Sequence, residues 1–408
     1  MSEERVQPYS WYALAVLTAV YVLNFLDRSL IYILFTPIKG EMKLTDLQLG
    51  ALGTLSFVLL YTLLGIPFGR MSDRSSRTKM IAIGLAVWSL FSGLTGFATN
   101  FWTLFGCRVM VGVGEATLGP AAFSLLCDFF PARMRATVQS VYASAIALGG
   151  GLAFFLGGWI GQTMGWRWAF YLLGFPGLVL ALLVFLLREP ARTRVQTSER
   201  ADWRPLLQSP SFRYICLGYA LLGLASNNLG IWGTTFYVRV HHVSLMTVGA
   251  AAGLLSVVIG VPAMIFGGYV SDRVRRRMAF TSFAALVSVP LWIAVLFTND
   301  IPLLVGVNVV LYALAILWVG PATADVTELA GPQLRGLAIG IFFSAVNISA
   351  YAIGAPVIGK LSDAYGLRYA LLVCPAVCAM GAVLLWLGSR ARRTVPASMN
   401  ATALSESA

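Results

Sequence analysis

The sequence predicts an all-α integral membrane protein whose twelve transmembrane helices form two pseudo-symmetric six-helix bundles. The first observation is composition: 58% of the 408 residues are hydrophobic and only 11% are charged, whereas soluble domains carry about 25% charged residues. The second is an internal repeat, in which G-R-M-S-D-R-S-S-R at 69–77 returns as G-Y-V-S-D-R-V-R-R at 268–276. Each copy follows a long apolar run, and such a long period is typical of membrane proteins built from two parallel halves.

Twelve stretches of the chain are apolar over about 20 residues or more, long enough to cross the hydrocarbon layer as helices. They are residues 11–35, 47–68, 80–99, 102–127, 137–161, 168–187, 212–238, 247–269, 278–298, 302–325, 336–360 and 368–389. This pattern predicts an N-terminal bundle at 1–187, a cytoplasmic linker at 188–211, a C-terminal bundle at 212–390 and a disordered cytoplasmic tail at 391–408.

The distribution of positive charge sets the expected orientation. With the N-terminus inside, 21 of the 29 Lys and Arg residues fall in cytoplasmic segments and 6 in outer ones, as the positive-inside rule requires. We therefore expect both termini in the cytoplasm of a multi-pass protein of the plasma membrane, the inner membrane of a bacterium. The first span is too long for a signal-peptide core and carries Asp27 and Arg28, so we expect it to be retained. The net charge of +12 indicates contact with membrane lipids and not with nucleic acid.

The sequence also argues against several other chemistries. The five cysteines lie in or beside apolar spans without a C-x-x-C pair, and the only histidines, His241 and His242, are neighbours in a short loop. We therefore expect no metal and no cofactor. The chain has no G-x-x-x-x-G-K-[ST] loop for nucleotide phosphates, no filter segment of a channel and no visible nucleophile and base pair of an enzyme.

The strongest functional signal is a set of ionisable residues inside the spans: Asp27, Arg108 and Glu115. Each costs roughly 2.5 to 3.5 kcal/mol at the bilayer centre and needs a partner or a wet cavity. Asp27 and Arg108 fall at similar depths, and Glu115 lies seven residues after Arg108 on the same helix face. We therefore expect one cation between two carboxylates, with a static buried ion pair as the alternative. Arg28, about 100° around the helix from Asp27, faces either the cavity or another helix.

Several motifs resemble those of a known family. The repeated G-x-x-x-D-R-x-x-R, R-V-M-V-G-V-G-E-A at 108–116 and A-L-G-G-G-L at 147–152 are similar to the major facilitator superfamily. N-F-L-D-R at 24–28, G-V-G-E-A at 112–116 and D-F-F-P-A-R-M-R-A at 128–136 resemble its Spinster branch, whose animal members export sphingosine phosphate or lysophospholipid.

The resemblance implies alternating access with protons as the coupling ion, and it makes Asp27, Arg108 and Glu115 the proton-coupling residues. The loop motif and its copy would form the cytoplasmic gate, with candidates Gly69, Asp73, Arg74, Arg77, Asp272, Arg273 and Arg276. Ile316 stands where the repeat places Glu115, which argues against a proton site in the second half.

Polar and aromatic side chains of the spans are the candidate substrate contacts: Asn24, Arg28, Thr117, Tyr142, Asn227, Asn228, Trp232, Trp318, Asn347 and Tyr351. We expect a monomeric, proton-coupled secondary transporter. The resemblance implies an amphipathic anion, such as a lysophospholipid or a sphingoid phosphate, as its substrate. A small organic anion, such as a sugar acid or another carboxylate, is the alternative substrate for the same arginines.

Overall fold

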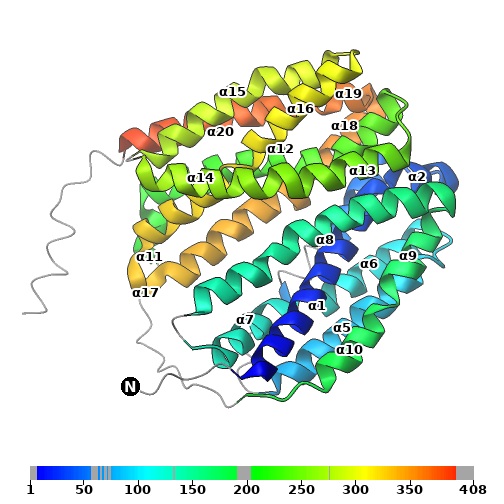
Figure 1. The fold of residues 1–408 in the computed structure, drawn as a ribbon. Helices are drawn as coiled ribbons and strands as arrows, with labels where there is room; N and C mark the ends of the chain where they lie inside the picture. Colours follow the sequence, from blue (N-terminus) through cyan, green and yellow to red (C-terminus); the bar gives the residue numbers. More distant parts are fainter. Residues whose placement is uncertain are drawn as a thin grey trace, which may run out of the picture. The chain divides into compact units, whose positions relative to one another are not determined.

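The computed structural model describes residues 7–56, 63–64, 67–68, 71, 75–131, 134–190, 204–274 and 276–391. All regular secondary structure in these ranges is helical (Figure 1). The predicted disordered tail and most of the predicted linker therefore lie outside the described residues.

The first half of the chain contributes the helices α1 (Pro8–Ile33), α2 (Phe35–Met42), α3 (Asp46–Gly50), η1 (Ala51–Leu55, a π-helical segment), α5 (Arg77–Thr95), α6 (Phe101–Glu115), α7 (Leu118–Phe129), α8 (Arg135–Thr163), α9 (Trp166–Gly174) and α10 (Gly177–Phe185). The second half contributes α11 (Arg204–Gln208), α12 (Pro210–Val240), α13 (Leu245–Leu255), η3 (Ser256–Gly260), α14 (Val261–Arg273), α15 (Arg277–Phe297), α16 (Ile301–Ile316), α17 (Val319–Asn347), η4 (Ile348–Gly354), α18 (Ala355–Tyr365), α19 (Leu367–Ala370) and α20 (Val373–Ala391).

Ten helices among the described residues are long and apolar enough to cross a membrane. The predicted span 47–68 is described at 47–56, 63–64 and 67–68, and its first part contains the end of α3 and the whole of η1. The predicted span 102–127 is divided, because α6 ends at Glu115 and α7 begins at Leu118. The backbone N–H of Ala116 bonds to the carbonyl of Gly112 and that of Thr117 to Gly114, both at 3.2 Å. Ala116 and Thr117 keep right-handed helical backbone angles, so only a short turn separates the two helices within the predicted span.

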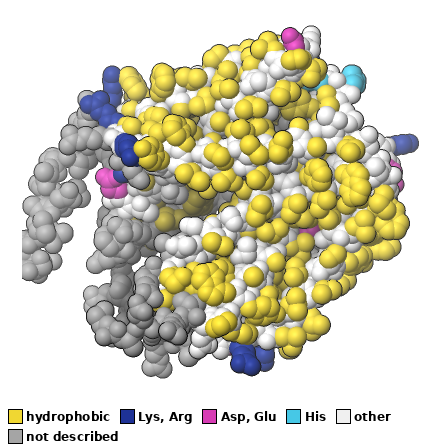
Figure 2. Space-filling model, in the orientation of Figure 1, with side chains coloured by type: hydrophobic (Ala, Val, Ile, Leu, Met, Phe, Trp, Pro, Cys, Tyr) yellow, Lys and Arg dark blue, Asp and Glu magenta, His cyan; other side chains and the backbone are white. Residues whose placement is uncertain are grey.

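Large apolar side chains point outward along the spans, as lipid contact requires. Trp102 is 75% exposed and Ile83 is 63% exposed. Figure 2 shows hydrophobic side chains over most of the visible face, with Lys and Arg gathered at its margins. Inside the N-terminal bundle, Trp88, Tyr142 and Phe130 belong to a continuous buried core.

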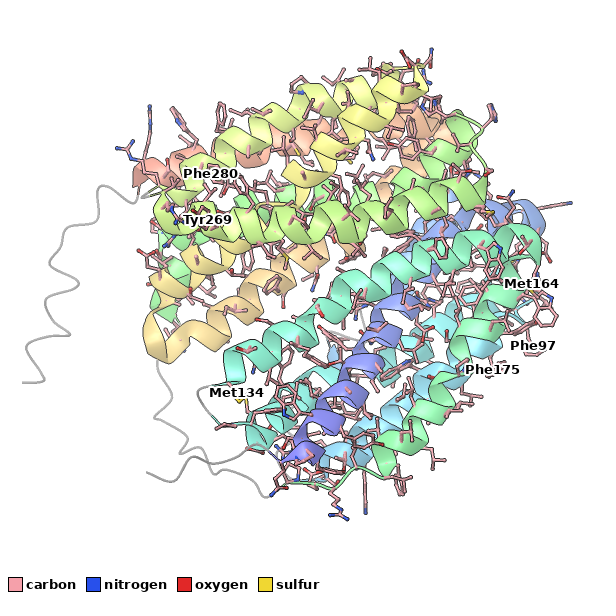
Figure 3. All side chains as sticks on the ribbon, in the orientation of Figure 1. Phe97, Met134, Met164, Phe175, Tyr269 and Phe280 are labelled. Atoms are coloured by element: carbon pink, nitrogen blue, oxygen red, sulfur yellow. The ribbon has the colours of Figure 1, made fainter. Side chains whose placement is uncertain are left out.

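Helix α8 packs closely on both α1 and α13, between which it runs in Figure 1. Figure 3 labels Met134 and Met164 beside its two ends. A Cβ at Gly149 would lie 2.3 Å from the carbonyl oxygen of Val22 on α1. A Cβ at Gly158 would lie 2.8 Å from the carbonyl oxygen of Leu245 on α13. Glycine is therefore required on two faces of the helix, where another backbone comes too close for a side chain.

Spatial contacts divide the described residues into two compact units. The described parts of Met1–Ser198, Asn228–Val261 and Tyr351–Ala370 form one, and those of Glu199–Asn227, Pro262–Ala350 and Leu371–Ala408 form the other. The first unit thus contains second-half segments that pack on the first half. The bundle and linker boundaries that the sequence predicts stay a prediction. The two units are defined by spatial contacts, whereas the predicted bundles are defined by the sequence repeat.

Candidate functional site

The predicted proton-coupling residues meet in the interior of the first unit. Asp27 of α1 and Arg108 of α6 are fully buried, and Glu115 at the end of α6 is 1% exposed. The side chain of Asn100 caps α6 by accepting from the backbone N–H of Thr103 at 2.9 Å. The helix that begins there carries Arg108 and Glu115 into the protein, two turns apart.

The hydrogen bonds differ from the expected arrangement of one arginine bonded between two carboxylates. Arg28 Nη2 donates to Glu115 Oε2 at 3.1 Å. Arg108 Nη1 instead donates to the backbone carbonyl of Asp27 at 3.2 Å. The carboxylate of Asp27 accepts from the hydroxyl of Ser92 on α5 at 2.8 Å. The cation hydrogen-bonded to Glu115 is therefore Arg28, although Arg108 lies within electrostatic reach of both Asp27 and Glu115.

This cluster contains buried polar atoms that lack a hydrogen-bond partner among the described residues. They are Oδ2 of Asp27, and Nε and Nη2 of Arg108. Unpaired buried charge is costly in a low dielectric. A proton on a carboxylate, or a rearrangement of the arginines, would relieve that cost.

Arg28 is the most accessible member of the cluster. Its side chain is 20% exposed while that of Glu115 is fully buried. The guanidinium also lies over the ring of Phe25, 5.1 Å from the ring centroid. A cation with an aromatic neighbour and a partly open side suits an anionic group that is attached to an apolar body.

Three substrate candidates of the first unit make packing contacts. Thr117 Oγ1 donates to the carbonyl of Gly114 at 2.8 Å, and Tyr142 stacks on Tyr21 with ring centroids 4.3 Å apart. Trp232 Nε1 donates to the carbonyl of Ala355 at 3.3 Å. Asn24 and Asn228 are also buried. Their substrate roles stay predictions.

Of the remaining substrate candidates, Asn227, Trp318 and Asn347 belong to the second unit and Tyr351 to the first. Trp318 Nε1 donates to Ser226 Oγ at 3.2 Å, and Asn227 Nδ2 donates to the carbonyl of Gly223 at 2.8 Å. Trp318 and Ser226 also line a small hollow whose other walls are mostly apolar. Asn347 ends α17, while Tyr351 of η4 belongs to the first unit, and both side chains are half-buried.

Of the predicted gate residues, Gly69, Asp73 and Arg74 lie outside the described residues, as does the side chain of Asp272. Arg273 stacks on Tyr269, with the guanidinium carbon 3.4 Å from the ring centroid, and exposed Arg276 precedes α15. Arg77 is different, because its side chain is only 3% exposed.

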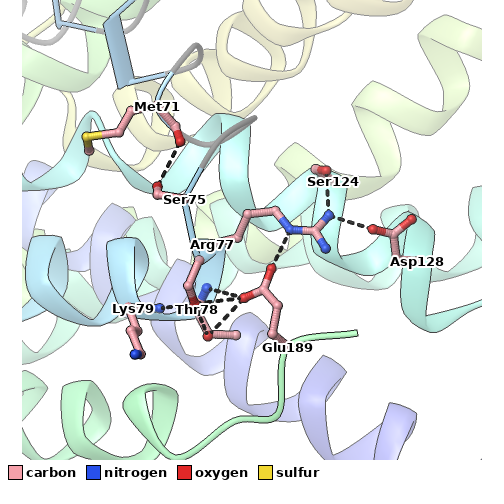
Figure 4. Close-up of polar contacts among 9 residues, drawn as sticks. Met71, Ser75, Arg77, Thr78, Lys79, Ser124, Asp128 and Glu189 are labelled. Atoms are coloured by element: carbon pink, nitrogen blue, oxygen red, sulfur yellow. Dashed lines mark hydrogen bonds and ion pairs between the residues drawn. The ribbon is translucent and has the colours of Figure 1, made fainter. Parts of the chain in front are cut away.

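Arg77 joins three parts of the N-terminal bundle (Figure 4). It donates to Asp128 on α7 at 2.6 Å, to Glu189 after α10 at 2.8 Å and to Ser124 at 2.8 Å. Partial burial would raise the pKa of Glu189, but hydrogen bonds from Arg77, Thr78 and Ser76 outweigh it and lower that pKa. Arg77 therefore does more than add positive charge to this end of the bundle.

The same ion pair returns in the second half. Arg277 is paired with Glu328, each exactly 200 positions after Arg77 and Asp128, and the short Nη1–Oε2 contact joins α15 to α17. The sequence repeat had matched Arg77 with Arg276. The structure corrects this match by one residue, because the side chain that meets the acidic partner belongs to Arg277.

The sequence analysis missed one further cluster, which we call the outer cluster because charge distribution predicts these helix ends to be outside. Asp46 at the start of α3 accepts from Lys39 Nζ at 2.7 Å, Arg239 Nη1 at 2.6 Å and Ser362 Oγ at 2.6 Å. Asp363 accepts from the backbone N–H groups of Asp46 and Leu47. The available signal was the capping pattern Thr45-Asp46-Leu47-Gln48, which forms a complete capping box.

The comparison with protein families identifies the family to which this helical protein belongs. The model of the Major Facilitator Superfamily matches residues 17–349 and 215–405. The chain belongs to the Major Facilitator Superfamily. It is 31% identical over 408 residues to an MFS-type efflux pump of Mycolicibacterium smegmatis, covering 95% of this chain and 94% of that protein.

Other similar proteins are Spinster proteins and their bacterial homologues. It is 30% identical over 266 residues to protein spinster homolog 1 of Xenopus tropicalis, covering 62% of this chain and 50% of that protein. The match thus spans about half the length of that relative. A solved inward-facing, occupied structure of a bacterial homolog to the human lysosomal transporter Spinster superposes with a TM-score of 0.88 at 24% identity, covering 94% of this chain and 98% of that one. The predicted major facilitator fold is confirmed, and the chain is similar to Spinster proteins.

Proposed function

We propose that this Spinster-like transporter is a proton-coupled secondary transporter working by alternating access, and that it moves an amphipathic anion such as a lysophospholipid or a sphingoid phosphate. The observation that carries the proposal is the buried cluster of two carboxylates and two arginines. Its partly exposed member, Arg28, is hydrogen-bonded to one of the carboxylates, Glu115.

The cluster links anion binding to protonation through Arg28. An anionic head group that pairs with this arginine competes with Glu115 for the same donors. Glu115 then holds a charge without its partner in a buried setting, and it becomes neutral by taking up a proton. Asp27 behaves in the same way when Arg108 moves toward Glu115. No cofactor is needed, because the proton itself is the coupling ion.

The deciding experiment measures substrate accumulation in proteoliposomes with and without an imposed pH gradient. Asp27→Asn mimics the protonated carboxyl and should keep substrate binding while losing gradient-driven accumulation. Asp300→Asn is the matched control, because Asp300 caps α16 and Asn caps a helix about as well. Gradient-driven accumulation by the Asp27→Asn protein would rule out this residue as the coupling site.

The alternative substrate is a small organic anion held by Arg28 and Arg108. Binding of a lysophospholipid compared with a sugar acid to the purified protein separates the two classes. Arg28→Gln should weaken whichever anion binds. Because the relative from Mycolicibacterium smegmatis is described as an efflux pump, export is the direction to assay first. We also propose a monomer in the bacterial inner membrane with both termini in the cytoplasm.

A further inference from the structure

We propose that the outer cluster is a lock, meaning a set of contacts that holds the outer gate of the transporter closed. In this lock Asp46 pairs with two cations. Lys39 stays paired with Asp46 in every state, whereas Arg239 separates from Asp46 when the outer side opens. The proposal rests on alternating access. It adds residues that the loop motif of the family does not contain.

The lock holds first-half and second-half segments together within the first unit. Asp46 comes from α3, whereas Arg239 comes from the end of α12 and Ser362 from α18. Asp363 caps the first turn of α3 by accepting from the N–H groups of Asp46 at 2.7 Å and Leu47 at 2.9 Å. All three second-half residues therefore contact one turn of a first-half helix.

Close backbone packing continues the junction inward. A Cβ at Gly359 would lie 2.3 Å from the carbonyl oxygen of Asp46, and a Cβ at Gly50 would lie 2.6 Å from that of Ala355. The side chain of Asp46 is only 4% exposed. The carboxylate is thus enclosed by the junction and requires its cations.

Helix α2, which carries Lys39, is held in place by contacts with other first-half residues. Two residues further along α2, Glu41 accepts from Trp166 Nε1 at 2.6 Å and is also paired with Arg167. Arg167 in turn donates to the carbonyl of Ala98 at 2.9 Å. These contacts all lie within the first half, so α2 and Lys39 remain beside Asp46 when the second-half segments move away.

The two cations therefore stabilise different states. Arg239 and Ser362 bind Asp46 only while the junction is closed, so removing Arg239 destabilises the closed state alone. Lys39 shares Asp46 with Arg239 in the closed state but is its remaining cation in the open one. Removing Lys39 should therefore destabilise the open state more, because it leaves an unpaired carboxylate there.

The lock should also be insensitive to mild acid outside. Burial alone would raise the pKa of Asp46, but the contacts with Lys39, Ser362 and Arg239 outweigh it and lower that pKa. Asp363 is the other charged group beside it. Because the closed state holds the ionised form, its stabilisation is present above the ordinary carboxyl pKa and is lost only as the pH falls through the lowered value.

The test uses the full-length protein with a reporter cysteine, Ala355→Cys, labelled from outside by a membrane-impermeant maleimide. Ala355 is fully buried and lies eight residues, about 12 Å, from Asp363 along α18. We expect Arg239→Gln to raise the labelling rate roughly tenfold or more, Ser362→Ala to raise it less, and Lys39→Gln to lower it. Met246→Cys is the control for access of the reagent, because Met246 is exposed at the start of α13.

A double variant separates the lock from general loosening. Arg239→Gln should add little to the labelling of an Asp46→Asn protein, because the shared partner is already changed. A rise in labelling for Lys39→Gln equal to that for Arg239→Gln would overturn the proposal. Labelling does not depend on proton coupling, so unchanged labelling beside normal gradient-driven transport would reject the lock alone. If the variants change the labelling rate as expected but the protein shows no gradient-driven transport, the proposed function alone would be rejected.

Discussion

Replacing Arg77 by Gln should destabilise the protein far more than the same change at Arg277, its counterpart in the repeat. The side chains of Arg77 and Asp128 are 3% and 9% exposed, and that of Glu189 is 27% exposed. Arg277 and Glu328 are 24% and 60% exposed. Removing one partner of a fully buried pair costs about 3–5 kcal/mol, and the partial exposure of Glu189 reduces this to roughly 2–4 kcal/mol for Arg77→Gln. Arg277→Gln should cost about 0–1 kcal/mol, as an exposed pair does.

The free energy of unfolding can be measured by titrating the purified variants with SDS in mixed micelles, with recovery of the folded protein on dilution as the check that unfolding is reversible. Arg77→Lys keeps the charge but loses the fork of donors that meets Asp128 and Glu189 together, so it should recover only part of the loss. Equal losses in Arg77→Gln and Arg277→Gln would show that burial of the pair does not set its contribution.

Three further predictions concern other parts of the chain. Gly114→Ala should cost about 1–3 kcal/mol in the same titration, because its Cβ would lie 2.6 Å from the carbonyl of Gly84, whereas Gly106→Ala, with open space around it, should be near neutral. Since the pKa of Glu189 is lowered, its contribution is present above the ordinary value of 4.5 and is lost as the pH falls through the lowered one; thermal unfolding of Glu189→Gln should therefore change less than that of the wild type between about pH 5 and pH 3. Asp272→Asn should slow transport and leave its pH profile unchanged, and a normal rate with a shifted profile would contradict the division between gating and coupling.

The sequence was sufficient for the helical membrane fold, for the existence of the repeat and for three members of the buried cluster. The cost of charge in an apolar segment identified Asp27, Arg108 and Glu115 without any structure. It left open which arginine meets Glu115, because Arg28 lies about 100° from Asp27 on the helix and only the packing of α1 against its neighbours decides where it points.

Other features depend on tertiary contacts that no local pattern contains. The loop motif made Arg77 a gate candidate but did not show its partners, because Asp128 and Glu189 lie 51 and 112 residues away in the chain. The outer cluster brings Asp46 to Arg239, 193 residues further along the chain. The short turn after Glu115 was equally hidden, since the apolar composition continues across it.

The glycine faces of α8 also limit how a long-chain molecule reaches the interior. At Gly151 and Gly158 the backbones of α8 and α13 approach so closely that a single added carbon would lie about 3 Å from a carbonyl oxygen. A hydrocarbon chain is wider than that space, so it cannot pass sideways from the bilayer between these helices at this level. The proposed lipid-like substrate would therefore enter the protein at another level, because α8 and α13 are closed against the bilayer at these two glycines.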